Sequence, residues 1–300
     1  SFAILQALMG AFNPLYRVGA DAMTADLITE EKRPEAYSFM RMSNNVGVAI
    51  GPALGGLLAS RSYSTAFFLA AAGMITYAVL LLVRANETLP EPTGDLPAEK
   101  AMLAGYDRIF HDGRFMGFIL AFTLTSMMSS MMWTMLPVYT NRQFGLPENL
   151  YGLIPTTNAL MVVFFQYFVT QRTRKKPMIP VMAVGATFYM IATISVSFFS
   201  SFWGFWTCMV VHTLGELMLV PTATTFTANL APPDMRGRYM SVFGLTWNVA
   251  SGIAPLIGGF LSDQFSPVTT WYGSGVIGLI SILVYAFIAL RSDRSRTVTG

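Results

Sequence analysis

Residues 25–58 (ADLITEEKRPEAYSFMRMSNNVGVAIGPALGGLL) and residues 228–261 (ANLAPPDMRGRYMSVFGLTWNVASGIAPLIGGFL) align with each other without a gap, at an offset of 203 residues. Eleven positions are identical, and they fall on Arg, Asn, Pro and Gly as well as on common apolar residues. A long-period match of this kind indicates an internally duplicated chain whose two halves share one topology.

The composition around this repeat is that of a membrane protein. The chain has 300 residues, of which 53% are apolar and only 12% are charged, about half the roughly 25% usual in soluble domains. It contains one Cys and two His, which excludes a disulfide scaffold and a Cys/His metal module. A disordered chain is excluded by the apolar content.

Nine apolar segments are each long enough for a helix that crosses a bilayer. They are residues 1–27, 36–59, 64–84, 115–140, 151–170, 177–199, 202–230, 238–260 and 268–290. The polar stretch 85–114 separates three segments from six, so we expect an all-α membrane protein with an incomplete N-terminal half (1–84), a linker and a C-terminal half (115–300). Because the duplication implies equal halves, it predicts three further helices before Ser1.

Lysine and arginine are concentrated on one side of these segments. Of 19 such residues, 15 lie at 28–35, 84–114, 171–176, 231–238 or beyond 290, two lie on the other side and two lie within segments. The positive-inside rule therefore predicts that the first side and the C-terminus are cytoplasmic, in a plasma or bacterial inner membrane.

Three motifs resemble those of the major facilitator superfamily. Residues 47–56 (GVAIGPALGG) resemble the fifth-helix signature of its drug/proton antiporters, although Ser38 replaces the upstream Gly. Residues 6–10 (QALMG) resemble the fourth-helix signature, with Gln6 in place of Arg, and residues 171–177 (QRTRKKP) resemble its basic loop. The resemblance implies a twelve-helix bundle, here helices four to twelve, that transports a small molecule by alternating access.

Glycine and proline in the repeated segments have two interpretations. Small residues allow helices to approach closely in lipid, and proline bends a helix, so these residues either pack helices or form a hinge that gates the cavity. The candidates are Gly47, Gly51, Pro52, Gly55, Gly56, Pro255, Gly258 and Gly259.

Glu216 is the strongest candidate for a functional residue. It lies in the middle of segment 202–230, one helical turn after His212. A carboxylate at this depth is costly, so it usually faces a cavity or a partner. Glu216 is predicted to carry a proton or to anchor a cationic substrate, and the alternative is a structural contact with His212.

Three further charged residues lie within predicted segments. Arg17 and Asp21 are spaced for an ion pair within one helix, and Arg41 lies near the start of the second segment. We expect Arg41 to pair with Asp21 or Asp26, or to extend to the membrane surface.

Polar and adaptable side chains inside other segments are candidates for the cavity wall. Amides default to hydrogen bonds between helices, and Met-rich surfaces suit varied apolar ligands. These candidates are Asn45, Asn158, Gln166, Asn248, Met131 and Trp133.

Together these features predict a monomeric secondary transporter that exports amphipathic compounds in exchange for protons. An uptake symporter is the alternative within transport, and a membrane sensor or membrane-embedded enzyme is the alternative outside it. No clustered catalytic residues and no phosphate-binding loop are visible in the sequence, so neither a cofactor nor a metal nor nucleic acid is expected.

Overall fold

The computed structural model describes residues 16–59, 62–85, 87–88 and 98–297. Within these ranges the regular structure is entirely helical. The helices are residues 16–27, α2 (Arg33–Ala59), α3 (Tyr63–Arg84), α4 (Ala98–His111), α5 (Gly113–Phe144), α6 (Glu148–Tyr151), α7 (Leu153–Thr173), α8 (Met178–Ser195), α9 (Phe202–Leu230), α10 (Arg236–Gln264) and α11 (Thr269–Thr297), with short 3-10 turns at Val196–Phe198 and Pro233–Met235.

Seven of the described helices are long and apolar enough to cross a membrane, which confirms an all-α membrane fold. They are α3, α5, α7, α8, α9, α10 and α11. Of the other two predicted segments, 36–59 lies within α2 and is helical throughout, whereas only 16–27 of the first lies in the described part.

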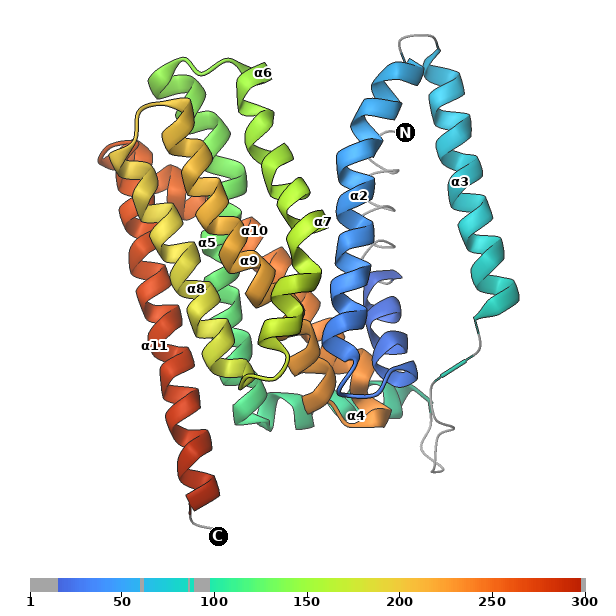
Figure 1. Cartoon of the computed structure of the whole chain (residues 1–300). Coiled ribbons are helices and arrows are strands. Elements are labelled where there is room, and N and C mark those ends of the chain that lie inside the picture. The colour runs from blue at the N-terminus through green and yellow to red at the C-terminus, as the bar shows by residue number, and fades with distance from the viewer. Residues whose placement is uncertain (1–15, 60–61, 86, 89–97, 298–300) are drawn as a thin grey trace.

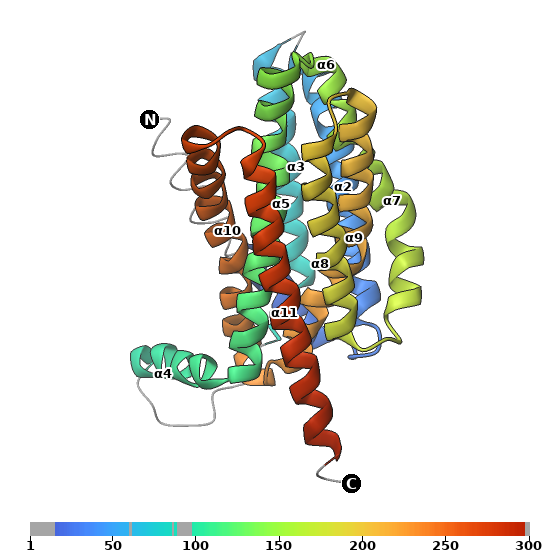
Figure 2. The ribbon, with the colours of Figure 1, turned by 90° about the vertical axis from the view of Figure 1, so that its left-hand side faces the viewer.

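The long helices run side by side, and several basic segments meet at one end of the bundle (Figure 1). We call this the basic end: it carries residues 28–32, 174–177 and 231–236 and the C-terminal end of α11. Within the predicted linker, α4 runs crosswise to α5 at this end and extends to one side of the bundle (Figure 2).

Local sequence explains where α5 starts and stops. The Asp112 carboxylate accepts hydrogen bonds from the backbone N–H groups of Arg114 and Phe115, at 3.1 and 3.0 Å, and so caps the first turn. The helix ends at Gly145, whose φ of 61° is in the left-handed region that favours glycine. α5 is therefore longer than the predicted segment 115–140.

The predicted small-residue contacts differ between the two repeats. A Cβ on Gly258 would lie 3.2 Å from Thr270 and 3.3 Å from Met135, so this glycine packs closely. No described atom lies within 4 Å of a Cβ built on Gly47, Gly51 or Gly259.

The remaining gating candidates are prolines and glycines of the repeated helices. Pro255 lies within α10, where it removes a backbone hydrogen-bond donor. The side-chain surroundings of Pro52, Gly55 and Gly56 lie outside the described residues. Their gating role therefore stays a prediction.

A close contact between helix backbones is formed by glycines of α8 and α9 instead. A Cβ on Gly215 would lie 2.6 Å from the carbonyl oxygen of Gly185, and a Cβ on Gly185 would lie 3.0 Å from the carbonyl oxygen of Gly215. Because both obstacles are backbone atoms, only a shift of the helices could relieve the clash.

We predict that Gly215→Ala destabilises the protein by about 1–3 kcal/mol, because the added methyl group overpacks this contact. Thermal unfolding of the purified protein in detergent measures the effect. Gly252→Ala in α10 is the matched control, since no described atom lies within 4 Å of its Cβ; equal melting temperatures for the two variants would contradict the prediction.

Candidate functional site

The carboxylate of Glu216, on α9, is held by side chains from two other helices. Nη2 of Arg41, on α2, lies 2.6 Å from Oε1, and Nδ2 of Asn158, on α7, lies 2.5 Å from Oε2. The Arg41 and Glu216 side chains are only 11% and 15% exposed. Burial strengthens the attraction within the pair and makes loss of either partner costly.

Arg41 thus pairs with Glu216, a partner that neither prediction for this residue named: a pair with Asp21 or Asp26, or extension to the membrane surface. Asp26 instead pairs with Arg236, and no salt bridge joins Arg17 to Asp21 among the described contacts. Side-chain distances across helices decide these partners, and sequence spacing does not supply those distances.

His212 lies beside Glu216 without forming a hydrogen bond to it. Its Nδ1 is 3.9 Å from Oε2 of Glu216, and neither ring nitrogen has a hydrogen-bond partner in the described part of the chain. The ring is fully buried and stacks on Tyr189 of α8, with centroids 4.0 Å apart and planes 6° apart. The contact between His212 and Glu216 is therefore one of proximity, without a hydrogen bond.

Glu216 also borders a cavity of about 230 Å³ between α5, α9 and α10. Half of the eight lining residues are serines or threonines of α5, and two tryptophans, Glu216 and one serine of α10 make up the rest. The lining residues are Ser126, Ser129, Ser130, Trp133, Thr134, Glu216, Trp247 and Ser251. The hydroxyls of Ser126 and Ser130 are buried and have no hydrogen-bond partner among the described residues, so they are available to a ligand or to water.

The other predicted wall residues do not line this cavity. Met131 is fully buried in an apolar cluster with Ala250 and Ala254, and Asn248 is exposed. Gln166 donates to the carbonyl of Leu217 at 2.9 Å, which joins α7 to α9.

The remaining polar candidate of the first repeat acts locally. Asn45 Nδ2 donates to the carbonyl of Arg41 at 3.0 Å, one turn earlier on the same helix. This contact steadies the turn of α2 from which Arg41 extends.

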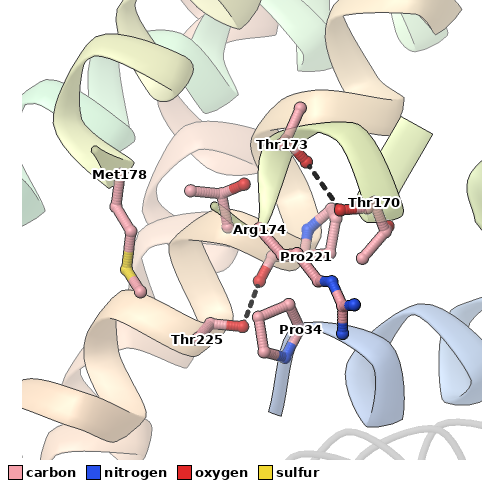
Figure 3. A pocket seen from close by; sticks show the side chains of 8 residues that line it. Pro34, Thr170, Thr173, Arg174, Met178, Pro221 and Thr225 are labelled. Atoms are coloured by element: carbon pink, nitrogen blue, oxygen red, sulfur yellow. Dashed lines mark hydrogen bonds between the residues drawn. The ribbon is translucent and has the colours of Figure 1, made fainter. Parts of the chain in front are cut away.

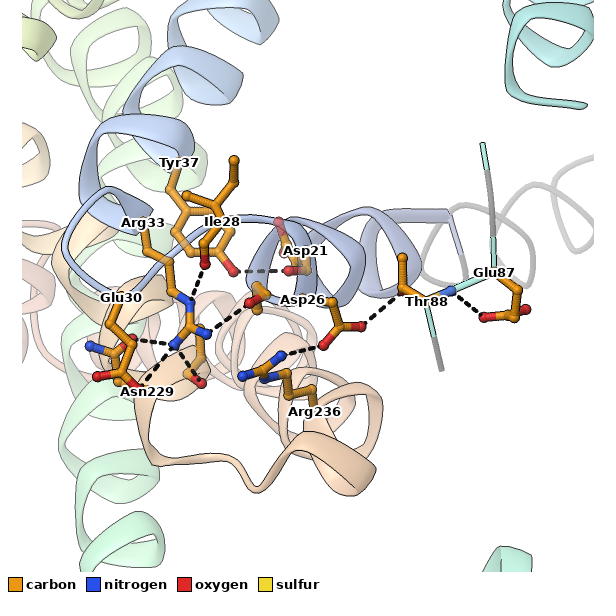
Figure 4. A network of polar contacts seen from close by, with 12 residues as sticks. Asp21, Asp26, Ile28, Glu30, Arg33, Tyr37, Glu87, Thr88, Asn229 and Arg236 are labelled. Atoms are coloured by element: carbon orange, nitrogen blue, oxygen red, sulfur yellow. Dashed lines mark hydrogen bonds and ion pairs between the residues drawn. The ribbon is translucent and has the colours of Figure 1, made fainter. Parts of the chain in front are cut away.

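At the basic end, Arg33 connects the N-terminal helices to the end of α9 (Figure 4). Its guanidinium donates to Oδ1 of Asn229 at 2.6 Å and to the carbonyl of Ala228 at 3.4 Å. It also donates to the carbonyls of Ala25 and Ile28, at 2.8 and 3.2 Å. The side chain is buried, and these acceptors satisfy its donors.

The duplication makes this contact reciprocal. Arg33 and Arg236 occupy equivalent positions in the repeat, and so do Asp26 and Asn229. Arg33 of the first repeat binds Asn229 of the second, while Arg236 of the second repeat forms a salt bridge with Asp26 of the first. We call these two contacts the arginine clasp.

A second set of polar contacts lies close to the arginine clasp at the basic end. Glu35 at the start of α2 forms a salt bridge with Arg174 and accepts a hydrogen bond from Gln171 at 2.8 Å. The pocket beside them has a volume of only about 10 Å³ (Figure 3), roughly enough for one water. Its lining residues are Pro34, Thr170, Thr173, Arg174, Met178, Pro221, Thr222 and Thr225.

The sequence model of the Major Facilitator Superfamily matches residues 1–248 and 179–299. The chain belongs to the major facilitator superfamily. It is therefore a membrane transporter by family, and its relatives and structural neighbours are transporters rather than enzymes.

Individual relatives are distant. A Na⁺, Li⁺, K⁺/H⁺ antiporter of Planococcus maritimus is 27% identical over 98% of this chain and 74% of its own length. The multidrug resistance protein MdtH of Salmonella arizonae is 22% identical over 98% of this chain and 72% of its own. The human organic anion transporter MFSD10 has the same fold, with a TM-score of 0.78 at 17% identity, covering 95% of this chain and 71% of that one.

Sequence reasoning singled out Glu216, Arg41 and Asn158 but did not join them, and it missed the arginine clasp. The repeat alignment could have indicated the clasp, because Arg33 and Arg236 are among its identical positions. It also missed Trp247 and the role of the α5 serines, which follow a helical spacing from Ser126 to Ser130 and Thr134.

We predict that Asn229→Asp favours the closed basic end, since it converts a neutral hydrogen bond to Arg33 into a charge-assisted one. A gain of about 1 kcal/mol corresponds to about a fivefold shift in population. Spin labels on Glu31→Cys and Lys175→Cys, both exposed at this end, measure the populations by pulsed electron resonance, while the native Cys208 is buried.

The same substitution in an Arg33→Gln background is the control. It should produce no such shift, because the partner of the new carboxylate is then absent. An equal shift in both backgrounds would show that residue 229 acts through something other than Arg33.

Proposed function

We propose that this protein exports small amphipathic molecules from the cytoplasm in exchange for protons, with the basic end on the cytoplasmic side. The observation that carries the proposal is the Glu216 carboxylate, which borders the cavity and is paired with Arg41 on a helix of the other repeat. A single titratable group is thus placed where both a proton and a substrate could reach it.

Protonation of Glu216 would remove the attraction that joins α9 to α2. At about 4 Å, two unit charges attract by about 4 kcal/mol in surroundings of intermediate polarity. Loss of this attraction releases Arg41 and allows the helices that carry the two residues to separate. Proton binding is in this way coupled to movement between the N-terminal and C-terminal helices.

The arginine clasp and the Glu35–Arg174 pair support a state that is closed at the basic end. In alternating access, two helical halves move about a central site so that it opens to one side at a time. The large cavity at Glu216 and the very small pocket at the basic end fit such a state. Opening towards the cytoplasm requires that these basic-end contacts break.

Exchange of an alkali cation for protons is a second candidate. Hard cations prefer oxygen ligands, and the cavity wall offers a carboxylate and several hydroxyl oxygens. The name of the Planococcus relative, a Na⁺, Li⁺, K⁺/H⁺ antiporter, is consistent with this candidate, whereas that of the multidrug resistance protein MdtH is consistent with drug export.

We predict that Glu216→Gln lowers the rate of proton-coupled transport at least about tenfold, because glutamine cannot carry the proton. Proteoliposomes with an imposed pH gradient and an internal pH dye measure proton movement when ethidium, KCl or NaCl is added. Export in exchange for protons requires the protons and the added solute to cross the membrane in opposite directions. Uptake by symport requires both to cross it in the same direction.

Asp263→Asn is the matched control, since this acid is exposed at the end of α10 opposite the basic end. It should retain the wild-type rate. Undiminished proton exchange by the Glu216→Gln variant would overturn the proposal.

A further inference from the structure

Glu216 already holds an organic cation in this structure, namely the guanidinium of Arg41. The Nη2 of Arg41 is 2.6 Å from Oε1, while Nδ2 of Asn158 takes the other oxygen at 2.5 Å. This arrangement shows directly how the site binds a positively charged group with N–H donors.

Arg41 reaches the carboxylate from a different helix, and part of its own hydrogen-bonding capacity is unused. Its buried Nε has no partner among the described residues. The groups that face Glu216 are Arg41 from α2, Asn158 from α7 and His212 from its own helix, with Tyr189 of α8 stacked behind the histidine. Among the described residues that face the carboxylate, Arg41 is therefore the one with a permanent positive charge.

The neighbouring cavity offers what such a cation would need after displacing Arg41. Ser126 and Ser130 present buried hydroxyls without hydrogen-bond partners among the described residues. Their oxygens can accept hydrogen bonds from the N–H groups of a ligand. Trp133 and Trp247 present indole rings at the same cavity, and such rings attract cations and cover apolar groups.

We propose that Arg41 is a tethered competitor for the ligand of this cavity, and that the ligand is a small organic cation with N–H donors, a guanidine or a primary amine. The proposal rests on the proposed function and specifies its substrate class. Ligand and Arg41 then occupy Glu216 in turn, so ligand binding itself breaks the contact between α2 and α9.

The size and charge of the site favour this class over two others. A bound water needs roughly 10–15 Å³ of such space, so a single alkali ion would leave most of the 230 Å³ cavity to water. An anionic ligand would be repelled by Glu216 and would need Arg41 as its partner. The effect of removing Arg41 therefore has opposite signs for cations and anions.

Isothermal titration calorimetry of the full chain in detergent tests the proposal, with phenylguanidine as the cation and phenylurea as its neutral counterpart. We expect Arg41→Gln to raise the affinity for phenylguanidine at least about tenfold, because the competing state is removed. Arg41→Lys keeps a tethered cation and should remain within about threefold of wild type. Glu216→Gln, alone or combined with Arg41→Gln, should abolish binding, and phenylurea should bind none of the variants.

Weaker phenylguanidine binding in a folded Arg41→Gln variant would overturn the proposal, because Arg41 would then be part of the ligand site. Equal binding of phenylurea would overturn it as well. Folding of each variant is checked by its melting temperature and elution volume, with Arg142→Gln as a control on an exposed arginine.

This experiment and the transport assay can fail separately. If proton exchange depends on Glu216 but Arg41→Gln does not raise the affinity for phenylguanidine, the proposed function is retained and the role of Arg41 as a competitor is rejected. If phenylguanidine binds with the expected pattern among the variants but the transport assay shows no proton movement, the binding site is retained and proton coupling is rejected.

Discussion

The Glu216 carboxylate is the constraint on which the rest of the site depends. An ionised carboxylate within an apolar bundle is tolerated only when charges or hydrogen-bond donors compensate for the lost water. Here α9 supplies the carboxylate, α2 the guanidinium of Arg41 and α7 the amide of Asn158. The chemistry of one side chain thereby fixes how three helices from both repeats pack, and a change in its charge affects all of them.

The basic end also depends on arginine side chains that bind across the two repeats, and the duplication explains their positions. Each repeat has an arginine at the start of a long helix and a short polar residue shortly before it. In the structure each arginine reaches the polar residue of the other repeat, with Arg33 on Asn229 and Arg236 on Asp26. The contacts are equivalent in position but unequal in charge, since only one has a carboxylate. The contact between Arg33 and Asn229 is the weaker one by this criterion.

Sequence periodicity and charge are sufficient to predict the helices, the membrane fold and the position of Glu216 near the middle of α9. They are not sufficient to predict its partners, because Arg41 is 175 positions away along the chain and only the crossing of α2 with α9 brings the two together. The prediction of the residues that line the cavity fails for a different reason. Met131 was chosen by composition, but it lies one position after Ser130, on the face of α5 that packs against Ala250 and Ala254. Helical phase along α5 separates the hydroxyl face from the methionine face.

A double-mutant cycle on Arg41 and Glu216 tests the central claim most directly. Unfolding free energies would be compared for the wild type, Arg41→Met, Glu216→Met and the double variant in the same detergent. Each single variant leaves a buried charge without its partner, which costs about 3–5 kcal/mol, whereas removing both charges costs much less. The account predicts a double variant more stable than either single variant; losses that simply add would contradict a direct interaction between the two residues.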